Sequence, residues 1–141
     1  MTKFTVSKNG TPFKDFTYDE KTKTFFTESD SLVIDFGDEY CITFKTGSDC
    51  TFKTGYNCTF KTGYNCTFNT YYNCTFKTGD NCFVIRYDVN GVIEIPENKT
   101  IKLNEYKIAG YTIVEPPIET VELTVADIEK LVGKRVKIIK S

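Results

Sequence analysis

An eight-residue repeat is the feature that most limits how this chain can fold. The octad CTFKTGYN and its variants follow one another without a gap over 34–89, which makes seven copies. The copies begin at residues 34, 42, 50, 58, 66, 74 and 82. A unit this short cannot bury an apolar face by itself, so the copies are expected to stack on one another.

The order of residues within the octad predicts a strand followed by a corner. Cys at position one and Phe at position three are separated by Thr and followed by Lys, which is the alternation of a half-buried strand with Cys and Phe inward. Gly-Tyr-Asn at positions six to eight then indicates a corner, with Gly expected to supply a positive φ and Asn able to adopt the left-handed region. The sequence therefore predicts an all-β fold, a small β-solenoid.

The number of octads in one coil is open between two and three. Two octads per coil would stack three tyrosines along one edge: Tyr40, Tyr56 and Tyr72. Stacked aromatic rings gain contact energy, which favours this arrangement. The same arrangement stacks three like charges on one face, which is mildly unfavourable: Lys45, Lys61 and Lys77. Three octads per coil would scatter the tyrosines over different corners.

The segments on either side of the repeat are expected to cap the open ends of the solenoid, because uncovered edge strands invite aggregation. Residues 1–33 contain Asn9-Gly10, a hairpin signal, and are predicted to form a β-hairpin cap before the solenoid of 34–89. A C-terminal β segment is predicted at 90–115. A short helix and a strand are predicted at 118–141, where they would either cap the solenoid or serve as a dimerisation or partner-binding element.

Composition closes several classes of function. The chain has 141 residues and no histidine, which excludes Ser/His and Cys/His nucleophilic pairs and histidine metal ligands. A net charge of −1 argues against a dedicated nucleic-acid binder. The six cysteines form no C-x-x-C pair, so we expect them to pack as small apolar side chains and expect no bound metal or cofactor. The N-terminus lacks the apolar run of a signal peptide, and no window is long enough to span a membrane, so we expect a cytoplasmic protein.

The surface positions of the repeat supply the candidate binding residues. Tyrosines concentrate at corners where no core requires them, and tyrosine is enriched in protein interfaces. The candidate partner-binding residues are Tyr40, Tyr56, Tyr64, Tyr71 and Tyr72. Tyr71 stands where other octads have Gly, which predicts a conformational cost of about 1 kcal/mol. The row of Lys45, Lys61 and Lys77, here called the lysine row, could contact phosphates. The neighbouring row of Thr43, Thr59 and Thr75 is a weaker candidate for ice binding.

The octads resemble those of uncharacterised octapeptide-repeat proteins from phages, prophages and low-GC Gram-positive bacteria. The tail TVADIEKLVGKRVKII is similar to a short C-terminal element of small proteins from the same setting. More distantly, Cys-x-Phe is similar to the layout of pentapeptide-repeat proteins, some of which are DNA-shaped inhibitors. The chain departs from that family in its period of eight and in lacking an acidic coat. None of these resemblances implies a catalytic residue.

These observations favour a non-enzymatic binding protein that is phage-encoded and inhibits a host macromolecule, as anti-CRISPR and other anti-defence proteins do. The expected partner is a protein, such as a host defence complex. A structural or virion component is the alternative, with an ice-binding or nucleic-acid-binding solenoid behind it. No paired catalytic motif supports an enzyme.

Overall fold

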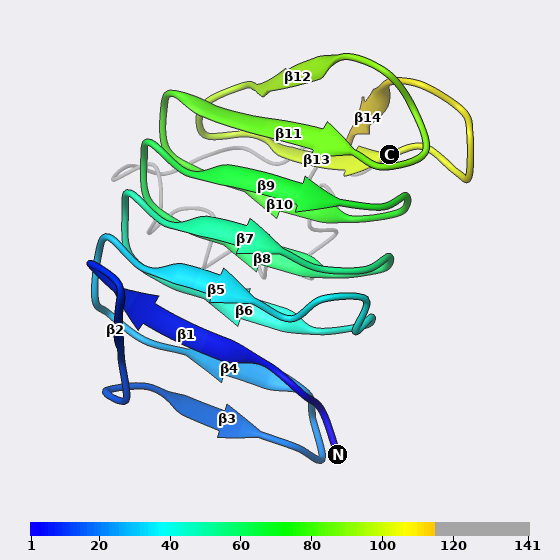
Figure 1. Cartoon of the computed structure of the whole chain (residues 1–141). Coiled ribbons are helices and arrows are strands. Elements are labelled where there is room, and N and C mark those ends of the chain that lie inside the picture. Colours follow the sequence, from blue (N-terminus) through cyan, green and yellow to red (C-terminus); the bar gives the residue numbers. More distant parts are fainter. Residues whose placement is uncertain (115–141) are drawn as a thin grey trace, which may run out of the picture.

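The structure is a computed structural model that describes residues 1–114, and its strands form two seven-stranded sheets (Figure 1). Sheet A contains, in spatial order, β2 (Thr11–Pro12), β1 (Thr5–Lys8), β5 (Val33–Asp35), β7 (Thr51–Lys53), β9 (Thr67–Thr70), β11 (Cys82–Arg86) and β12 (Val92–Ile95). Sheet B contains β3 (Thr17–Asp19), β4 (Thr24–Phe26), β6 (Thr43–Lys45), β8 (Thr59–Lys61), β10 (Thr75–Lys77), β13 (Thr100–Leu103) and β14 (Tyr111–Ile113). The chain alternates between the sheets along the repeat, so the predicted β-solenoid is confirmed.

The strand register shows that two octads make one coil. Thr43 of β6 lies opposite Thr59 of β8, which lies opposite Thr75 of β10, all in parallel. Strands β7, β9 and β11 follow the same offset of sixteen residues in sheet A. Each sheet therefore holds four parallel strands, one from each coil, and Figure 1 shows the coils stacked along one axis.

Phenylalanine rings fill the space between the sheets. In sheet B, Phe44, Phe60 and Phe76 stack with centroids 4.9 Å apart and planes within 4°. In sheet A, Phe52 stacks on Phe68 at 5.0 Å, and Phe52 meets Phe60 across the interior edge to face at 5.2 Å. All of these rings are buried. Such pairs contribute about 0.5–1.5 kcal/mol each beyond the burial of their area.

Five of the six cysteines line the interior beside these rings, as predicted: Cys50, Cys58, Cys66, Cys74 and Cys82. Their thiols donate to backbone carbonyls of the corners, as Cys82 Sγ does to Gly63 O at 3.4 Å. Cys41 differs, because it is exposed and stands where most octads have Asn, with a φ of 59°. All six thiols are free.

A second inward polar row, at octad position five, was not anticipated from the repeat. Thr54, Thr70 and Thr78 are buried, and each hydroxyl donates to the carbonyl oxygen of the next residue at 3.0–3.3 Å. The short local hydrogen bond satisfies the hydroxyl without a partner from another coil. A threonine can therefore occupy the interior at each corner.

The corners correct one prediction about the glycines. Asn57, Asn65 and Asn73 have φ values of 56–57°, so asparagine supplies the left-handed residue as expected. The position-six glycines do not have positive φ. A Cβ at Gly55 would lie 2.5 Å from the carbonyl oxygen of Asp38, so glycine is needed there because the preceding coil approaches closely. Tyr71 also lacks a positive φ, so the conformational cost expected for it on that ground does not apply.

The first octad is out of register by two residues. The repeat predicts that Ile34 stacks on Cys50, but Ile34 pairs with Phe52. Leu32, two residues earlier in the chain, lies beside Cys50 instead. Two additional residues enter the following corner, where the N–H of Gly37 donates to the carboxylate of Asp35 at 2.8 Å. The corner restores the register, since Cys41 N donates to Tyr56 O.

Antiparallel strands close both ends of the solenoid (Figure 1). The Asn9-Gly10 turn joins β1 to β2, and β1 pairs with β5. At this end β4 pairs in parallel with β6, so the parallel coils begin before residue 34. At the other end β12 covers β11, while β13 and β14 continue sheet B after β10.

The helix and strand predicted at 118–141 lie outside the described residues. So does the expectation that this segment caps the solenoid or mediates dimerisation.

Candidate functional site

Tyrosines line the edge where the chain turns from sheet A to sheet B. Tyr40 and Tyr56 stack with centroids 4.8 Å apart and planes within 5°, and Tyr56 and Tyr72 stack at 5.1 Å and 6°. Tyr106, from the turn between β13 and β14, meets Tyr72 at 5.3 Å and 67°. The ladder predicted from octad position seven is therefore present, and the C-terminal cap lengthens it by one ring.

A second, shorter row runs beside the first. Tyr71 packs against Tyr87 with centroids 4.8 Å apart and reaches Tyr72 at 6.5 Å. Together the two rows form what we call the tyrosine edge: Tyr40, Tyr56, Tyr71, Tyr72, Tyr87 and Tyr106.

A buried arginine fixes the turn that carries Tyr106. The guanidinium of Arg86 donates to the carbonyl oxygens of Glu105 at 3.0 Å and Ile108 at 2.7 Å. It also forms an ion pair with Asp88 at 2.6 Å, and a backbone N–H of the turn donates to the same carboxylate at 2.7 Å. Burial alone would raise the pKa of Asp88, but the hydrogen bonds and charge of Arg86 keep that pKa below its usual value. The network is fully paired, so it holds Tyr106 against the ladder.

Two phenols of the edge, Tyr56 and Tyr87, have raised pKa values and are neutral near pH 7. Burial together with the neighbouring Tyr40 and Tyr72 raises the pKa of Tyr56. Burial and the carboxylates of Asp35 and Asp38 raise the pKa of Tyr87. Neutral hydroxyls both donate and accept hydrogen bonds, so the edge offers a row of such groups.

Stacking decides which parts of the rings a ligand can reach. Neighbouring rings cover each other's faces within the row, and the ammonium groups of Lys23 and Lys107 lie 5.1 Å and 5.4 Å from the outer rings, Tyr40 and Tyr106. Tyr40 and Tyr106 are exposed and Tyr56 and Tyr72 are half-buried, and the stacked faces are the part of each ring that its neighbour covers. A planar ligand such as a sugar or a base would need ring faces, whereas a protein surface can pack on ring edges and pair with hydroxyls.

The opposite edge, where the chain turns from sheet B to sheet A, carries a different set of side chains. Tyr64 is 51% exposed, and the residues at its position in the neighbouring coils are Ser48 and Asp80. The N–H of Tyr64 donates to Ser48 Oγ at 3.2 Å, and Asn81 donates to Asn65 at 2.5 Å. Tyr64 is therefore not brought together with the other four predicted tyrosines.

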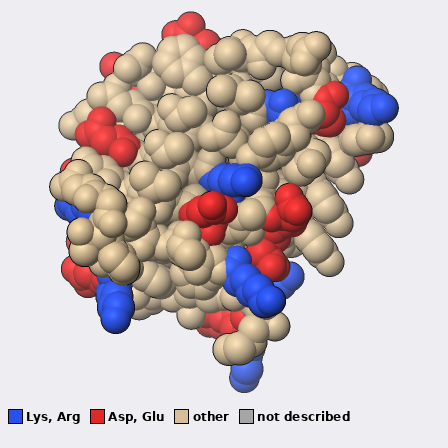
Figure 2. Space-filling model, viewed as in Figure 1, with Lys and Arg blue, Asp and Glu red and all other residues tan. Residues whose placement is uncertain are grey.

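The lysine row lies on the outer face of sheet B. Lys45 pairs with Lys61, which pairs with Lys77, and all three side chains are exposed. The threonines two positions earlier form a parallel row on the same face: Thr43, Thr59 and Thr75. On the side of the molecule drawn in Figure 2, positive and negative side chains intermingle among uncharged surface.

The interior thiols offer no preformed metal site within residues 1–114. Within residues 1–114 no group of three or more Cys, Asp or Glu side chains is arranged to hold a metal ion. The thiols of Cys50 and Cys66 share a hydrogen bond. It lowers the pKa of Cys50 to about 7 and raises the pKa of Cys66 to about 11. Burial raises the pKa of Cys74 as well. These thiols lie in the core, where reagents cannot reach them.

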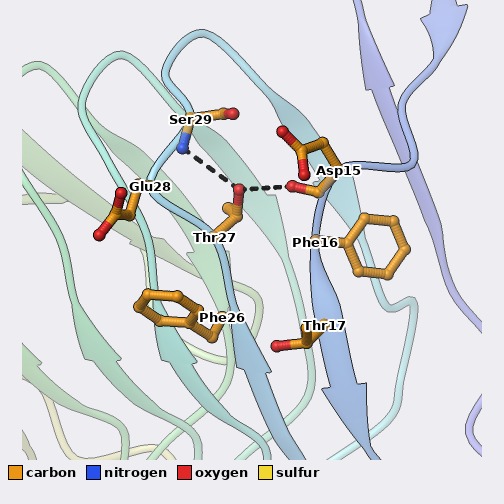
Figure 3. Close-up of a pocket in the computed structure, with 7 residues that line it drawn as sticks. All are labelled: Asp15, Phe16, Thr17, Phe26, Thr27, Glu28 and Ser29. Atoms are coloured by element: carbon orange, nitrogen blue, oxygen red, sulfur yellow. Dashed lines mark hydrogen bonds between the residues drawn. The ribbon is translucent and has the colours of Figure 1, made fainter.

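A shallow hollow lies at the N-terminal end, between β3 and β4 (Figure 3), with a volume of about 220 Å³. Its central hydroxyl is occupied, because Thr27 Oγ1 donates to Asp15 O at 2.9 Å and accepts from Ser29 N at 3.2 Å. Asp15 and Glu28 lie on opposite sides of Thr27 in Figure 3. Because the two carboxylates do not converge, the hollow lacks the paired acids of a hydrolytic site.

Sequence reasoning missed Tyr87, Tyr106 and Arg86. Tyr87 falls sixteen residues after Tyr71, so extending the coil register would have identified it. Arg86 occupies the inward position held by Thr in other octads, which is a detectable departure. Tyr106 lies beyond the repeat, and no periodicity in the sequence places it on this edge.

Comparison with protein-family models, with curated proteins and with solved structures finds no match to this chain. The described residues contain no helix of the length and apolar character that crossing a membrane requires. The fold and the tyrosine edge therefore define the molecule as a β-solenoid with one aromatic edge.

Proposed function

We propose that the chain is a non-enzymatic binding protein and that the tyrosine edge contacts a protein partner. One observation carries the proposal: six tyrosines line one edge, while the same octads close the other edge with Ser48, Tyr64 and Asp80. Because either kind of corner satisfies the fold, the tyrosine row is not required for coil formation. A binding role accounts for the presence of the row on one edge.

The chemistry of the edge suits a protein surface. Tyrosine brings a large contact area while only two side-chain torsions are fixed, which keeps the entropic cost of binding low. Stacking and the Arg86 network hold the rings in place before binding, so little further order is lost. The hydroxyls can pair with backbone and side-chain groups of the partner.

The octapeptide resemblance suggests which partner to test. It favours a phage-encoded inhibitor acting in the bacterial cytoplasm, with a host defence complex such as a CRISPR effector as its target. Under this proposal the protein acts by occupying a surface of the target. The alternative, a structural or virion component, predicts that the edge binds further copies of the same chain.

The experiment captures partners from bacterial lysate with three immobilised proteins: the wild type, Tyr56→Ala/Tyr72→Ala, and Tyr64→Ala. Truncating a tyrosine buried at an interface often costs 2 kcal/mol or more, so the double variant should lose a captured protein at least about tenfold. Tyr64→Ala, a matched change on the other edge, should retain it. Equal capture by all three proteins would contradict the proposal. Capture of the chain itself would support the structural alternative.

A further inference from the structure

The two outer faces of the solenoid differ in charge although the same octads build them. On sheet B, Lys45, Lys61 and Lys77 lie in register, and β13 adds Lys102 opposite Thr75. All four lysine side chains are exposed. Lys45, Lys61 and Lys77 occupy neighbouring strands about 4.8 Å apart, and Lys102 lies diagonally from Lys77, so positive charge is concentrated on a small area.

Sheet A does not keep this row. At the corresponding register Lys53 is flanked by Asp35 on β5 and by Asn69 on β9, and Ile85 follows on β11. At octad position four, all three octads of sheet B have lysine, whereas one octad of sheet A has it. The lysine row is therefore found on sheet B alone of the two sheets, although octads build both.

The lysines of sheet B have no carboxylate partners within residues 1–114. The ion pair between Arg86 and Asp88 is the one salt bridge in that part of the chain. Among the outward positions of the described sheet B strands, the acidic residue is Asp19. It lies on the edge strand β3, opposite Thr24 of β4. Like charges in register are mildly unfavourable, and a bound anion would relieve the repulsion.

We propose that the outer face of sheet B binds the phosphate backbone of duplex nucleic acid without regard to base sequence. Lysine and threonine donate to phosphate oxygens, and neutralising phosphates releases counterions. The site is separate from the tyrosine edge and extends the function beyond binding a protein.

Other occupants fit this face less well. Its exposed aromatic side chain is Phe26, which lies under Lys45 with the ammonium 5.6 Å from the ring, so a single strand would find no platform for stacking its bases. Apart from Phe26, the outward positions of the described sheet B strands lack the large apolar side chains that insert into a lipid interface. Lysine is also depleted at the centres of protein interfaces.

The net charge of −1 does not prevent this binding at moderate salt. The acidic residues of the described chain lie mainly at the corners, in the caps and on sheet A. Those on sheet A are separated from the outer face of sheet B by at least the spacing of two packed sheets, about 10 Å. The Debye length is also about 10 Å at 0.1 M salt, so charges beyond the opposite sheet are largely screened.

The test measures fluorescence anisotropy of a labelled 24-base-pair duplex of mixed sequence as salt is varied from 20 to 150 mM. Four lysines predict a slope of log K against log salt of about −3 to −4, with dissociation constants of about 10⁻⁴ to 10⁻⁶ M. The variant Lys45→Gln/Lys61→Gln/Lys77→Gln should bind at least about tenfold more weakly at 50 mM salt and have a slope smaller by about 3.

The matched control is Lys3→Gln/Lys14→Gln/Lys53→Gln, which makes the same change in net charge away from sheet B. It should bind within about twofold to threefold of the wild type, and thermal melts should show both variants folded. Equal losses in the two triple variants, or a wild type that does not bind the duplex at 20 mM salt, would overturn the proposal. Binding to anionic vesicles without binding to the duplex would overturn it too. Tyr56→Ala/Tyr72→Ala should bind the duplex normally, so this site and the tyrosine edge can fail independently.

Discussion

The two edges of the solenoid are built from the same octad and differ mainly at position seven. One edge presents Tyr40, Tyr56 and Tyr72 as a stacked row, whereas the other presents Ser48, Tyr64 and Asp80. Both edges close the coil with a left-handed residue at position eight, at φ values of 56–59°. The comparison shows that the corner depends on the backbone at positions six and eight, while position seven is free to serve the surface.

The same comparison separates what holds the coils together from what the surface can bind. Phenylalanine, cysteine and threonine rows run through the interior and serve both edges equally. A change in the interior should therefore affect both edges, and a change at position seven should affect one.

The largest effect on stability is expected from the shared interior. Phe60→Ala would leave a cavity between Phe44 and Phe76 and should lower the free energy of unfolding by about 3–5 kcal/mol. Cys58→Ala and Cys66→Ala remove one heavy atom each and should cost about 1 kcal/mol. Denaturant melts measure all three. Equal losses, or a large loss on adding reductant or chelator, would mean that the thiols are bridged or bind metal.

Alanine at Gly55 and alanine at Gly63 should cost unequal amounts of stability. At Gly55, on the tyrosine edge, the added Cβ would lie 2.5 Å and 2.8 Å from backbone carbonyl oxygens of the preceding coil, which cannot move aside. At Gly63, on the other edge, the contact is with the side chain of Ser48, which can rotate. Gly55→Ala should cost about 1–3 kcal/mol and Gly63→Ala less, as measured by thermal melts. A greater loss at Gly63 would show that the backbone contact is not what requires glycine.

Alkaline pH should weaken the fold through the thiols shared by both edges. In the unfolded chain a cysteine has a pKa of about 8.5, whereas Cys66 titrates at about 11 and burial raises the pKa of Cys74. Between those values the unfolded state has released protons that the folded state retains, so stability falls as pH rises, by about 1.4 kcal/mol per pH unit for each thiol. The low pKa of Cys50 acts in the opposite direction only between about 7 and 8.5.

Denaturant melts from pH 8.5 to 10.5 measure this loss, and Cys66→Ala/Cys74→Ala should reduce the dependence, while the raised pKa of Cys82 leaves part of it. A dependence unchanged in that variant would assign the alkaline loss to other groups.

The smallest effect on stability is expected at the tyrosine edge. Tyr56→Ala/Tyr72→Ala removes stacking on a partly exposed row, and each aromatic pair contributes about 0.5–1.5 kcal/mol. The variant should remain folded with a modestly lower melting temperature, while Tyr64→Ala, which has no ring partner within the described residues, should change it less. Unfolding of the double variant would show that the row is required for the fold.

The repeat made much of this architecture predictable. Inward Cys and Phe and the left-handed Asn follow from a strict period, because stacked copies must place like residues in like environments. The period left two or three octads per coil open, and the stacking of Tyr40, Tyr56 and Tyr72 favoured two. The period could not reveal the two-residue shift near Ile34, since the first octad retains apolar residues in both registers. The repeat also suggested a positive φ for the position-six glycines, whereas Gly55 is required because the neighbouring coil approaches it closely.

The candidate site was predictable in part for the same reason. Tyr40, Tyr56 and Tyr72 meet because they share an octad position on one edge, and Tyr64 falls on the other edge by the same rule. The contribution of Tyr106 depends on a turn held by hydrogen bonds from Arg86, a contact that links residues far apart in the sequence. Such contacts depend on the cap, which has no period.

The most direct test of the central claim places a photoreactive group on each edge in turn. Tyr56 and Tyr64 occupy the same position in identical octads, so p-benzoylphenylalanine at either site changes the octad equally. With the protein captured from lysate as partner, irradiation should give a covalent adduct from position 56 and little or none from position 64. An adduct from position 64 alone, or equal adducts from both positions, would contradict the assignment of the tyrosine edge as the protein-binding surface.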